Sequence, residues 1–517
     1  MRRQRQVIVL VLLWTLNSCF LFGAGPSASN LKPRPNVLFI AVDDMNDWVS
    51  LFGGHPQAKT PNLDRFADSG AVVFRQAHCA GPVCGPSRSA LLSGFMPHTT
   101  GLYGNANNML DSEIVQTHAT LPEYFSKHGY RSISRGKIFH AHATANGRDR
   151  GQWAFDEYHS GEGGSGVDRS RVYSRDRNLI NGNPGPQSLH TRKGGSEFAW
   201  GPTKGPKEDT SDYKTARWAA SKLQEQYDAP FFLAIGLSKP HLPFYVPQEF
   251  FDLYDPATTK ANAINESDLN DILLPSGKQK LKASADYLWL QENELIDTAA
   301  RAYLAAISYA DTCLGVILAG LEKSPHYENT IVVIWGDHGW HLGEKLRYRK
   351  ATGWHESTRT PLIIRLPGMT DKQNCDRLVN LIDLYPTLIE LCELPPKKLD
   401  GRSIATLISE PDKNWPHATT TIFGQGNASI HKDYWHYILH RDGTEELYDL
   451  NKDPMEWTNL IQSPSELSRQ AHAELRELYP DNFARVVPIN SSNTRANKQS
   501  GGLDRTLKAT RDLSKLK

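Results

Sequence analysis

The residues best suited to carry chemistry stand in one run of eleven, Cys84-Gly85-Pro86-Ser87-Arg88-Ser89-Ala90-Leu91-Leu92-Ser93-Gly94. A thiol and a permanent cation flank a Pro/Ser turn there, and the residues that follow suit a helix that Ser87 could cap. Because helix N-termini bind anions through free backbone N–H groups, a nucleophile at Cys84 would face an oxyanion site, with Arg88 one turn away. A cysteine at an ordinary capped turn is the alternative, and composition alone favours it.

Three carboxylates follow two predicted strands. Asp43 and Asp44 come directly after the apolar run 36–42, and Asp337 follows the run 330–335. In sheets covered by helices on both faces, functional residues gather at the carboxyl ends of strands. Adjacent carboxylates are costly unless a cation neutralises them, and oxygen donors suit a hard divalent ion. We therefore expect a metal site at this edge, although acidic residues also cap helices without any metal.

Strands alternate with helices along most of the chain. Continuous apolar runs of strand length are typical of strands buried on both faces, and they occupy 36–42, 231–236, 330–335 and 362–366. Helical patterns occupy 60–69, 121–128, 212–227 and 295–321. This alternation predicts an α/β fold with helices on both faces of the sheet.

The alternation of strands and helices is interrupted within the predicted catalytic domain, which spans residues 35–370. Residues 142–205 hold Gly- and Pro-rich clusters with little apolar periodicity. A loop of that length in a compact domain is usually functional or disordered. We expect a loop-rich surface insertion near the site.

The pattern changes again toward the C-terminus. Residues 371–480 predict a smaller subdomain that starts with a helix over 378–391. Its strand patterns are at 419–423, 435–440 and 446–450. Residues 493–517 carry seven Lys/Arg against two Asp and predict a solvated, disordered basic tail.

The N-terminus has the pattern of a secretory leader. Three arginines within the first five residues precede the apolar run 7–16, and small residues follow up to position 28. The pattern predicts a signal peptide over 1–28 and an exported protein, periplasmic or secreted, because the apolar run is too short to span a bilayer. A membrane anchor, or a lipoprotein attached through Cys19, is the alternative.

Composition excludes some classes of partner. The 517 residues carry a formal net charge of +1, with 39% hydrophobic and 22% charged residues. No chain-wide field exists to recruit nucleic acid, and no stable membrane insertion is expected. Without Cys19 five cysteines remain, an odd and sparse set that forms no disulfide framework. One thiol is left over, and the surroundings of Cys84 offer it a chemical role.

The run 84–94 matches without a break the sulfatase signature, Cys-x-Pro-Ser-Arg-x-x-Leu-Leu-(Thr/Ser)-Gly. Further blocks occur in the order of that family: Asp43-Asp44, Thr60-Pro61-Asn62-Leu63-Asp64, Gly136-Lys137, Lys239-Pro240-His241, Gly336-Asp337-His338-Gly339 and Leu447-Tyr448-Asp449-Leu450. Over residues 35–460 the chain thus resembles the type I formylglycine-dependent sulfatases of the alkaline phosphatase-like superfamily. Blocks at 136–140, 239–244 and 337–340 look closest to the iduronate 2-sulfatase branch, which also includes bacterial polysaccharide sulfatases.

The resemblance implies a fold, a modified residue and a metal. The fold would be a large mixed, mostly parallel sheet sandwiched by helices, with a smaller C-terminal α+β subdomain. A maturation enzyme would oxidise Cys84 to Cα-formylglycine. One Ca²⁺ ion would be bound by Asp43, Asp44, Asp337 and His338, together with an oxygen of the modified residue 84. Many sulfatases have Asn in place of His338, but the iduronate-type branch shares this histidine.

The resemblance also implies covalent catalysis. One hydroxyl of the hydrated aldehyde at residue 84 would attack sulfur, activated by calcium and by Asp337, and form a sulfo-enzyme intermediate. His241 would protonate the leaving alcohol. Lys137 and Lys350 would hold the sulfate oxygens, where charge must be offset in the transition state.

The remaining catalytic and binding roles are assigned to individual residues. The second hydroxyl would lose its proton to His140 as sulfate is expelled, and Arg88 belongs to the catalytic set through the signature. Lys350 is placed by its distance from Asp337 and by the stretch 350–356, which departs slightly from the family pattern. Residues that could contact a sugar, with packing or plain exposure as the alternative for each, are His98, Trp48, Trp340, Arg349 and His355.

These features predict a hydrolase of sulfate esters on a carbohydrate, a sulfated polysaccharide or its oligosaccharides. One alternative is a phosphonate or phosphodiester hydrolase of the same superfamily. Another is a catalytically silent protein that binds sulfated glycans. A silent binder would need a lost metal ligand or a lost catalytic cation, yet every expected position is filled.

Overall fold

The computed structural model describes residues 33–140, 154–159, 179–180, 183–184, 198–488 and 517. The predicted signal peptide with Cys19, most of the insertion at 142–205 and the basic tail up to residue 516 lie outside the described residues. The described residues from Arg34 onward form one compact unit.

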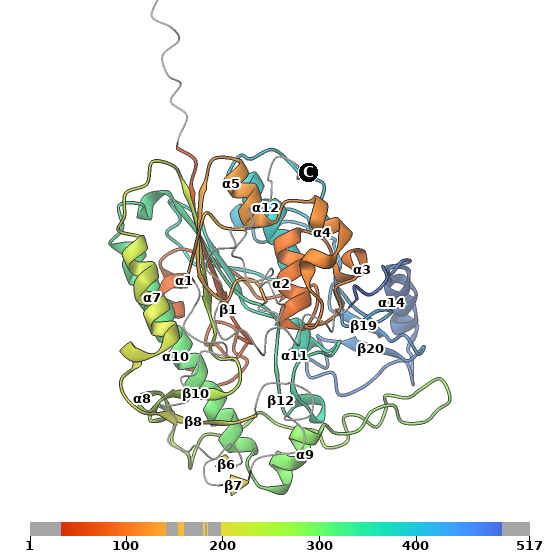
Figure 1. Cartoon of the computed structure of the whole chain (residues 1–517). Coiled ribbons are helices and arrows are strands. Elements are labelled where there is room, and N and C mark those ends of the chain that lie inside the picture. The colour runs from red at the N-terminus through yellow and green to blue at the C-terminus, as the bar shows by residue number, and fades with distance from the viewer. Residues whose placement is uncertain (1–32, 141–153, 160–178, 181–182, 185–197, 489–516) are drawn as a thin grey trace, which may run out of the picture. The chain divides into compact units, whose positions relative to one another are not determined.

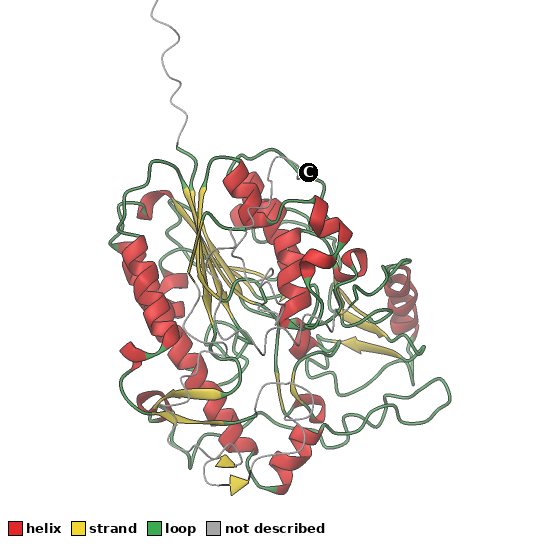
Figure 2. Ribbon diagram, in the orientation of Figure 1, coloured by secondary structure: helices red, strands yellow, loops and turns green. Residues whose placement is uncertain are grey.

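An eight-stranded sheet runs through the centre of this unit (Figures 1 and 2). Its strand order is β15-β2-β14-β11-β1-β9-β4-β5; β14 is antiparallel to both neighbours, and all other neighbouring pairs are parallel. The strands are β1 (Asn36–Val42), β2 (Val72–Phe74), β4 (Arg131–Gly136), β5 (Glu157–His159), β9 (Phe231–Leu237), β11 (Thr330–Gly336), β14 (Leu362–Arg365) and β15 (Gln373–Cys375). The mixed, mostly parallel sheet and all four predicted strands are confirmed.

Helices cover both faces of the sheet. Because β1 is buried on both faces, its sequence is apolar throughout. Leu38, Ile40 and Val42 enter one core layer, whereas Phe39 and Ala41 enter the other. The first layer includes α1 (Pro61–Asp68), α7 (Ser211–Lys222) and α10 (Ile296–Glu322). The second layer includes α2 (Cys84–Ser93), α5 (Leu121–Lys127) and α12 (Leu384–Leu391). Because successive side chains alternate between faces, a strand buried on both faces reads as a continuous hydrophobic run.

Helix α10 is long and apolar enough to cross a bilayer by length and composition, but 78% of its most apolar window is buried inside the protein. It packs on α7, α1 and the sheet as a core helix. The predicted helices at 60–69, 121–128, 212–227 and 295–321 are all present within a few residues.

A smaller four-stranded antiparallel sheet lies in the C-terminal part of the chain, with α14 (Glu466–Glu477) packed on it (Figure 1). Its strands, in spatial order, are β17 (Thr419–Ile422), β18 (Ala428–Lys432), β19 (Trp435–Leu439) and β20 (Glu445–Asp449). Strand β18 was not predicted: it alternates between apolar and polar residues, but Ala428 and Ile430 are its only apolar residues, too few for a clear strand signal. The helix predicted over 378–391 is wrong at its start: residues 379–380 pair as a strand, and the helix begins at Leu384.

Short elements connect these layers. The strands among them are β3 (Ala77–His78), β6 (Leu179–Ile180), β7 (Asn183–Pro184), β8 (Trp200–Thr203), β10 (Phe244–Pro247), β12 (His341–Leu342), β13 (Tyr348–Arg349) and β16 (Val379–Asn380). The helices among them are α3 (Pro97–Thr100), α4 (Glu113–Thr117), α8 (Gln248–Phe251), α9 (Ala285–Glu292), α11 (His355–Thr358) and α13 (Ala405–Ser409).

Candidate active site

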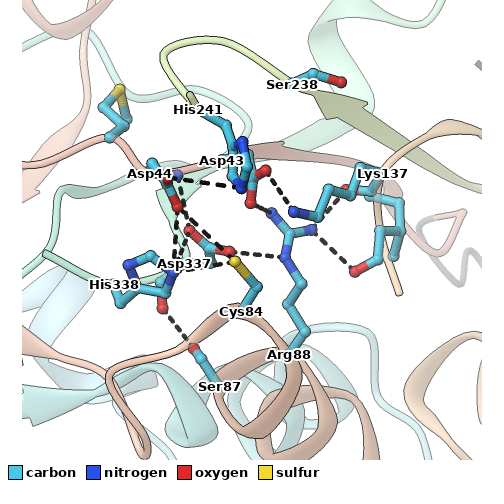
Figure 3. Close-up of polar contacts among 12 residues, drawn as sticks. Asp43, Asp44, Cys84, Ser87, Arg88, Lys137, Ser238, His241, Asp337 and His338 are labelled. Carbon is cyan, nitrogen blue, oxygen red and sulfur yellow. Dashed lines mark hydrogen bonds and ion pairs between the residues drawn. The ribbon is translucent and has the colours of Figure 1, made fainter. Parts of the chain in front are cut away.

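Four neighbouring parallel strands deliver most of the predicted site residues to one edge of the sheet. Asp43 and Asp44 follow β1, Asp337 follows β11, Lys137 follows β4, and His241 lies in the loop after β9. Since β11, β1, β9 and β4 are adjacent and parallel, their carboxyl ends meet. Helix α2 approaches this edge with Cys84 and Arg88 (Figure 3).

Arg88 links the carboxylates of two strands. Its Nε donates to Asp337 Oδ2 at 2.8 Å, and its Nη2 donates to Asp43 Oδ1 at 3.1 Å (Figure 3). Its Nη1 donates to the carbonyls of Lys137 and Ile138. The side chain is completely buried, so these bonds satisfy a cation that would otherwise be costly to remove from water. Arg88 therefore fixes the carboxylates of β1 and β11 relative to α2.

Cys84 lies where acidic and basic side chains converge. Its Sγ is 3.0 Å from Lys350 Nζ, 3.3 Å from His338 Nε2 and 3.8 Å from Asp44 Oδ1. His140 also hydrogen-bonds to this sulfur. Burial alone would raise the pKa of the Cys84 thiol, but the charges of Lys137, Lys350 and His338 lower it well below its ordinary value. The position favours an anion at the side chain of residue 84.

The two lysines are tied to the carboxylates of β1. Lys137 Nζ donates to Asp43 Oδ2, and Lys350 Nζ donates to Asp44 Oδ1. Burial would raise the pKa of Asp43, but Lys137 and Arg88 hold it well below its ordinary value. The positive charges of both lysines act on residue 84, and Lys350 Nζ contacts its sulfur, so both favour an anion held there.

The donor set at this edge fits a divalent cation. Donor atoms of Asp44, Cys84, Asp337 and His338 all lie within 4.8 Å of one another. Asp44 Oδ2 is buried without a hydrogen-bond partner, and His338 Nε2 is 3.4 Å from Asp44 Oδ1 and 3.5 Å from Asp337 Oδ1. Burial raises the pKa of Asp337 to about 6 despite the nearby His338 and Arg88. A divalent cation would offset this crowding of carboxylates.

Asp44 adopts a backbone conformation that few non-glycine residues adopt. Its φ is 61°, in the left-handed region. Tyr303 Oη donates to its carbonyl at 2.7 Å, and its own N–H donates to Asp337 Oδ1 at 3.0 Å. Strained backbone that neighbouring groups hold in place is common at functional sites. Sequence reasoning missed Tyr303 because it stands 259 residues away, inside an apolar helix.

His241 points into the site from the loop after β9. Its Nδ1 hydrogen-bonds to the Leu242 carbonyl, which leaves Nε2 on the side of Asp44, 3.8 Å from Oδ2 (Figure 3). Behind it, buried Lys239 donates to the carbonyls of His241 and Pro243, and burial lowers the pKa of Lys239 to about 8. This loop is therefore held in place by internal hydrogen bonds.

One expectation for the helix that follows Cys84 is wrong, and a second is narrowed. Ser87 does not cap α2, because the helix begins at Cys84 and Ser87 Oγ donates to the Asp337 carbonyl. The N–H of Gly85 is also not free for an anion, since it donates to Asn105 Oδ1 at 2.7 Å. Charged side chains, rather than the start of the helix, are left to hold an anion.

Most of the residues considered for sugar contact pack against other side chains. Trp48 and Trp340 are buried in the core, and Lys350 Nζ lies 5.1 Å above the Trp340 ring. Arg349 donates to Asp286, and His355 is buried beside His78. His98, partly buried, has its ring centroid 5.9 Å from that of Phe483.

A cavity of about 200 Å³ lies next to Lys350 in the chain and was not predicted. Trp354 and Phe423 supply aromatic surface, and Arg347 supplies a cation whose Nε is buried without a hydrogen-bond partner. The remaining lining residues are Lys280, Leu281, Ala351, Thr352, Gly353, Ile438, His440 and Glu446. These residues come from distant segments, so no local spacing could have pointed to the cavity.

Comparison with known proteins agrees with this arrangement. The sulfatase family model matches residues 35–394, and a model of the N-sulphoglucosamine sulphohydrolase C-terminal region matches 336–480. A sulfatase of Formosa agariphila is 36% identical over 435 residues, covering 82% of this chain and 83% of that protein. Human iduronate 2-sulfatase is 29% identical over 431 residues, covering 75% of each chain.

A solved structure shares the fold. The phosphonate monoester hydrolase of Agrobacterium radiobacter superposes with a TM-score of 0.67 at 22% identity, covering 86% of this chain and 96% of that one. At this identity the likeness concerns the fold alone. The family match over residues 35–394 and the Formosa relative place the chain more narrowly: it belongs to the sulfatase family and is a sulfuric ester hydrolase.

Proposed function

We propose that this sulfatase removes sulfate from an anionic carbohydrate, with Ca²⁺ at the carboxylate cluster and formylglycine at position 84. The observation that carries the proposal is the setting of Cys84, whose sulfur contacts Lys350 and His338 and lies beside Asp44. A buried site in which cations and carboxylates meet around residue 84 suits a bound metal ion together with a sulfate group.

The sulfatase family in general uses formylglycine and a divalent metal, and residues of this chain fit both. Asp43, Asp44, Asp337 and His338 would hold the ion, and their predominance of oxygen donors favours calcium. When bound, the ion supplies Lewis-acid polarisation of the sulfate group. The formylglycine hydrate that a maturation enzyme produces supplies one hydroxyl to attack sulfur and a second through which sulfate is expelled.

The chain's own residues bind the sulfate group and move the protons. Lys137 and Lys350, whose charges both act on residue 84, hold the sulfate oxygens. His241 Nε2, which faces the site, gives its proton to the leaving oxygen. Asp337, whose pKa is raised by burial to about 6, takes a proton from the attacking hydroxyl, and His140 takes one from the second hydroxyl.

The cavity beside Lys350 supports a sugar with an acidic group as substrate. Trp354 and Phe423 provide aromatic surface for a sugar ring, and the lining includes the cation of Arg347 together with the carboxylate of Glu446. Guanidinium groups bind carboxylates and sulfates well because their donors form a planar fork. Human iduronate 2-sulfatase, one of the relatives, is named after a sugar acid.

The proposal is tested by assaying desulfation of defined oligosaccharides. We expect turnover of 2-sulfated uronic acid units to exceed that of phosphonate and phosphodiester substrates by orders of magnitude. Higher activity on phosphorus esters would instead favour the phosphonate hydrolase alternative. Mass spectrometry of the peptide around residue 84, from protein made in its native host, completes the test: unmodified cysteine together with no turnover would favour the silent binder.

The cavity itself is tested by Arg347→Gln. We expect the KM of a carboxylated sugar sulfate to rise about 10-fold with kcat unchanged, because the lost contact holds substrate outside the reacting centre. A sugar sulfate without a carboxylate should be unaffected. Arg217→Gln, at an exposed position of α7, is the matched control. If Arg347→Gln raised the KM of both substrates equally, the cavity would not be the site that recognises the carboxylate.

A further inference from the structure

A second cluster of metal-binding side chains lies outside the active site. His78 of β3, His355 of α11 and His431 of β18 meet in the interior, with exposed fractions of 0%, 7% and 1%. We call these residues the histidine triad. They come from three segments, and the last belongs to the C-terminal four-stranded sheet.

The spacing of the triad fits a tetrahedral ion. One ligand nitrogen from each ring can be chosen so that all lie within 4.8 Å of one another, and His355 Nδ1 is 3.3 Å from His431 Nε2. Two nitrogens bound to one tetrahedral zinc ion are about 3.3–3.4 Å apart, given Zn–N distances of about 2.0–2.1 Å. The ring centroids of His355 lie 5.4 Å from those of both His78 and His431. The rings of His78 and His431 lie closer together, with centroids 4.0 Å apart at an angle of 36°, and His355 approaches this pair from the side.

Two nitrogens of the triad are left without protein partners. His78 Nδ1 hydrogen-bonds to Thr358 Oγ1 at 3.1 Å, whereas its Nε2 is buried with no partner. His431 Nδ1 is also buried and unpartnered, but it is the nitrogen opposite Nε2, which faces His355 Nδ1, so the open nitrogen of His78 is the one that bears on the site. Buried polar groups normally have a hydrogen-bond partner, so each exception points to a missing ligand or water. A hydrogen bond from one ring nitrogen to a hydroxyl, with the other nitrogen open, is the usual arrangement of a metal-bound histidine.

A fourth imidazole borders the triad but is already engaged. His436 stacks on His431 with ring centroids 3.7 Å apart. Its Nε2 is 2.7 Å from Ser429 Oγ, and its Nδ1 pairs with Glu456. Both nitrogens of His436 are thus occupied, which leaves three imidazoles and one position for water.

The chemistry of the triad differs from that of a calcium site. All of its donors are imidazole nitrogens, and no carboxylate belongs to the set. Burial, with the nearby charges of Arg359 and His436, keeps the pKa of His78 and His355 well below the ordinary value, so these rings are neutral and able to bind a metal. Neutral imidazoles prefer zinc, copper or nickel over calcium.

We propose that the histidine triad binds one Zn²⁺ ion, which ties strand β18 of the C-terminal sheet to β3 and α11. This ion would be distinct from the metal at Asp43 and Asp44. Strand β3 leads into α2 through residues 79–83, and α11 follows Lys350 by five residues. Zinc at the triad would thus hold together the segments on which the catalytic cysteine and lysine stand.

The test begins with the full-length matured enzyme, dialysed against Zn²⁺ and then against chelator-free buffer that contains excess Ca²⁺ to clear weakly bound zinc. Elemental analysis should find about one zinc per chain, resistant to excess calcium. Isosteric variants His355→Gln and His431→Gln should lower this content at least about 10-fold. His417→Gln, a half-buried histidine beside Trp415 and outside the triad, is the matched control and should keep its zinc.

Spectroscopy of the wild-type protein decides the matter even if both triad variants misfold. Co²⁺ in place of zinc should give the strong visible absorption of a tetrahedral ion with nitrogen and oxygen ligands. Zinc content far below one per chain in folded wild-type protein would show that the triad is only a hydrogen-bonded histidine cluster. Zinc retained by folded His431→Gln, or displaced by calcium, would equally overturn the proposal.

Discussion

Two buried clusters of side chains lie at opposite extremes of charge. The acidic centre, made of Asp43, Asp44, Asp337, His338 and Cys84, is crowded with carboxylates. The histidine triad contains no carboxylate at all. Both are buried, and both draw on the chain segments around residues 77–88 and 350–358. Burial alone therefore does not determine what a cluster binds.

The difference lies in the cations that accompany each cluster. In the acidic centre, Arg88, Lys137 and Lys350 donate directly to carboxylates, so the pKa of Asp43 stays low and the carboxylate stays charged. No such cation donates to the rings of the triad among the described residues, and burial leaves its imidazoles neutral. One cluster is built to offset the charge of a sulfate and a hard ion, and the other suits a softer ion bound by neutral ligands.

The largest effect on activity should follow from removing the side chain of Cys84, around which the charged groups of the acidic centre meet. Cys84→Ala removes the nucleophile, and we expect kcat to fall by at least about 10⁴-fold. Cys84→Ser should at best yield a trapped sulfated enzyme, visible by mass spectrometry, unless the host's maturation enzyme also accepts serine. Cys79→Ala, at a buried thiol five residues away, should remain active. Activity retained by Cys84→Ala would move the chemistry away from the acidic centre.

Two chelators should separate the clusters. EGTA, which binds both calcium and zinc, should lower kcat by about 100-fold or more, because the carboxylates then repel the sulfate group, and added calcium alone should restore it. 1,10-Phenanthroline, which prefers zinc, should leave kcat unchanged but lower the melting temperature by several degrees. The measurement is a sugar sulfate assay beside a thermal melt for each treatment. Loss of activity with phenanthroline and none with EGTA would reverse the metal assignments.

The next effect concerns proton transfer at the edge of the acidic centre. His241→Asn removes the acid that faces the leaving oxygen, so kcat on a sugar sulfate should fall by about 10²-fold. An aryl sulfate with an acidic phenol needs no protonation and should react almost normally. Rates for a series of aryl sulfates check this: the variant should depend more steeply on the pKa of the leaving group. A uniform loss across the series would assign His241 to positioning alone.

The acidic centre could be predicted from the sequence, and the triad could not. Asp43, Asp44 and Asp337 stand directly after apolar runs, and parallel pairing of those strands dictates that they meet. Cys84 and Arg88 fall in one short motif. The triad instead combines positions 78, 355 and 431, whose separations follow no local period. Only the folded chain places them together. Because the sequence alone does not show this cluster, His355 was considered as a sugar contact instead.

Tertiary contacts that no local pattern shows also explain the smaller errors in the sequence-based predictions. Ser87 has the residue type of a cap, but its hydroxyl donates a hydrogen bond to the carbonyl of Asp337, 250 residues away. The helix predicted from position 378 begins late because residues 379–380 pair with β3, a tertiary contact that outweighs local propensity. Long apolar runs, by contrast, gave all four predicted strands, since they must be buried whatever their partners are.

The smallest predicted effect tests whether cations, rather than burial, set the charge of buried carboxylates here. Asp311 of α10 is buried like Asp43, but its partners are neutral: Asn62 N and Nδ2, at 3.1 and 2.7 Å, and Leu63 N at 2.8 Å. Burial raises its pKa to about 6. The folded state therefore holds this proton more tightly than the unfolded state, and stability falls as pH rises from about 4 to 6.

This dependence can be isolated by substitution. Between about pH 5 and pH 7, ionisation of Asp311 should lower the free energy of unfolding of the wild type by about 1 kcal/mol. Asp311→Asn should be less stable at every pH because it cannot accept all three hydrogen bonds, but it lacks this titration, so its deficit relative to the wild type should shrink by the same amount. Urea unfolding at the two pH values, with Glu322→Gln at an exposed position of α10 as control, measures the difference. A deficit that grows with pH would mean that neutral donors alone keep a buried carboxylate charged, and the cations of the acidic centre would then serve sulfate binding rather than the charge of Asp43.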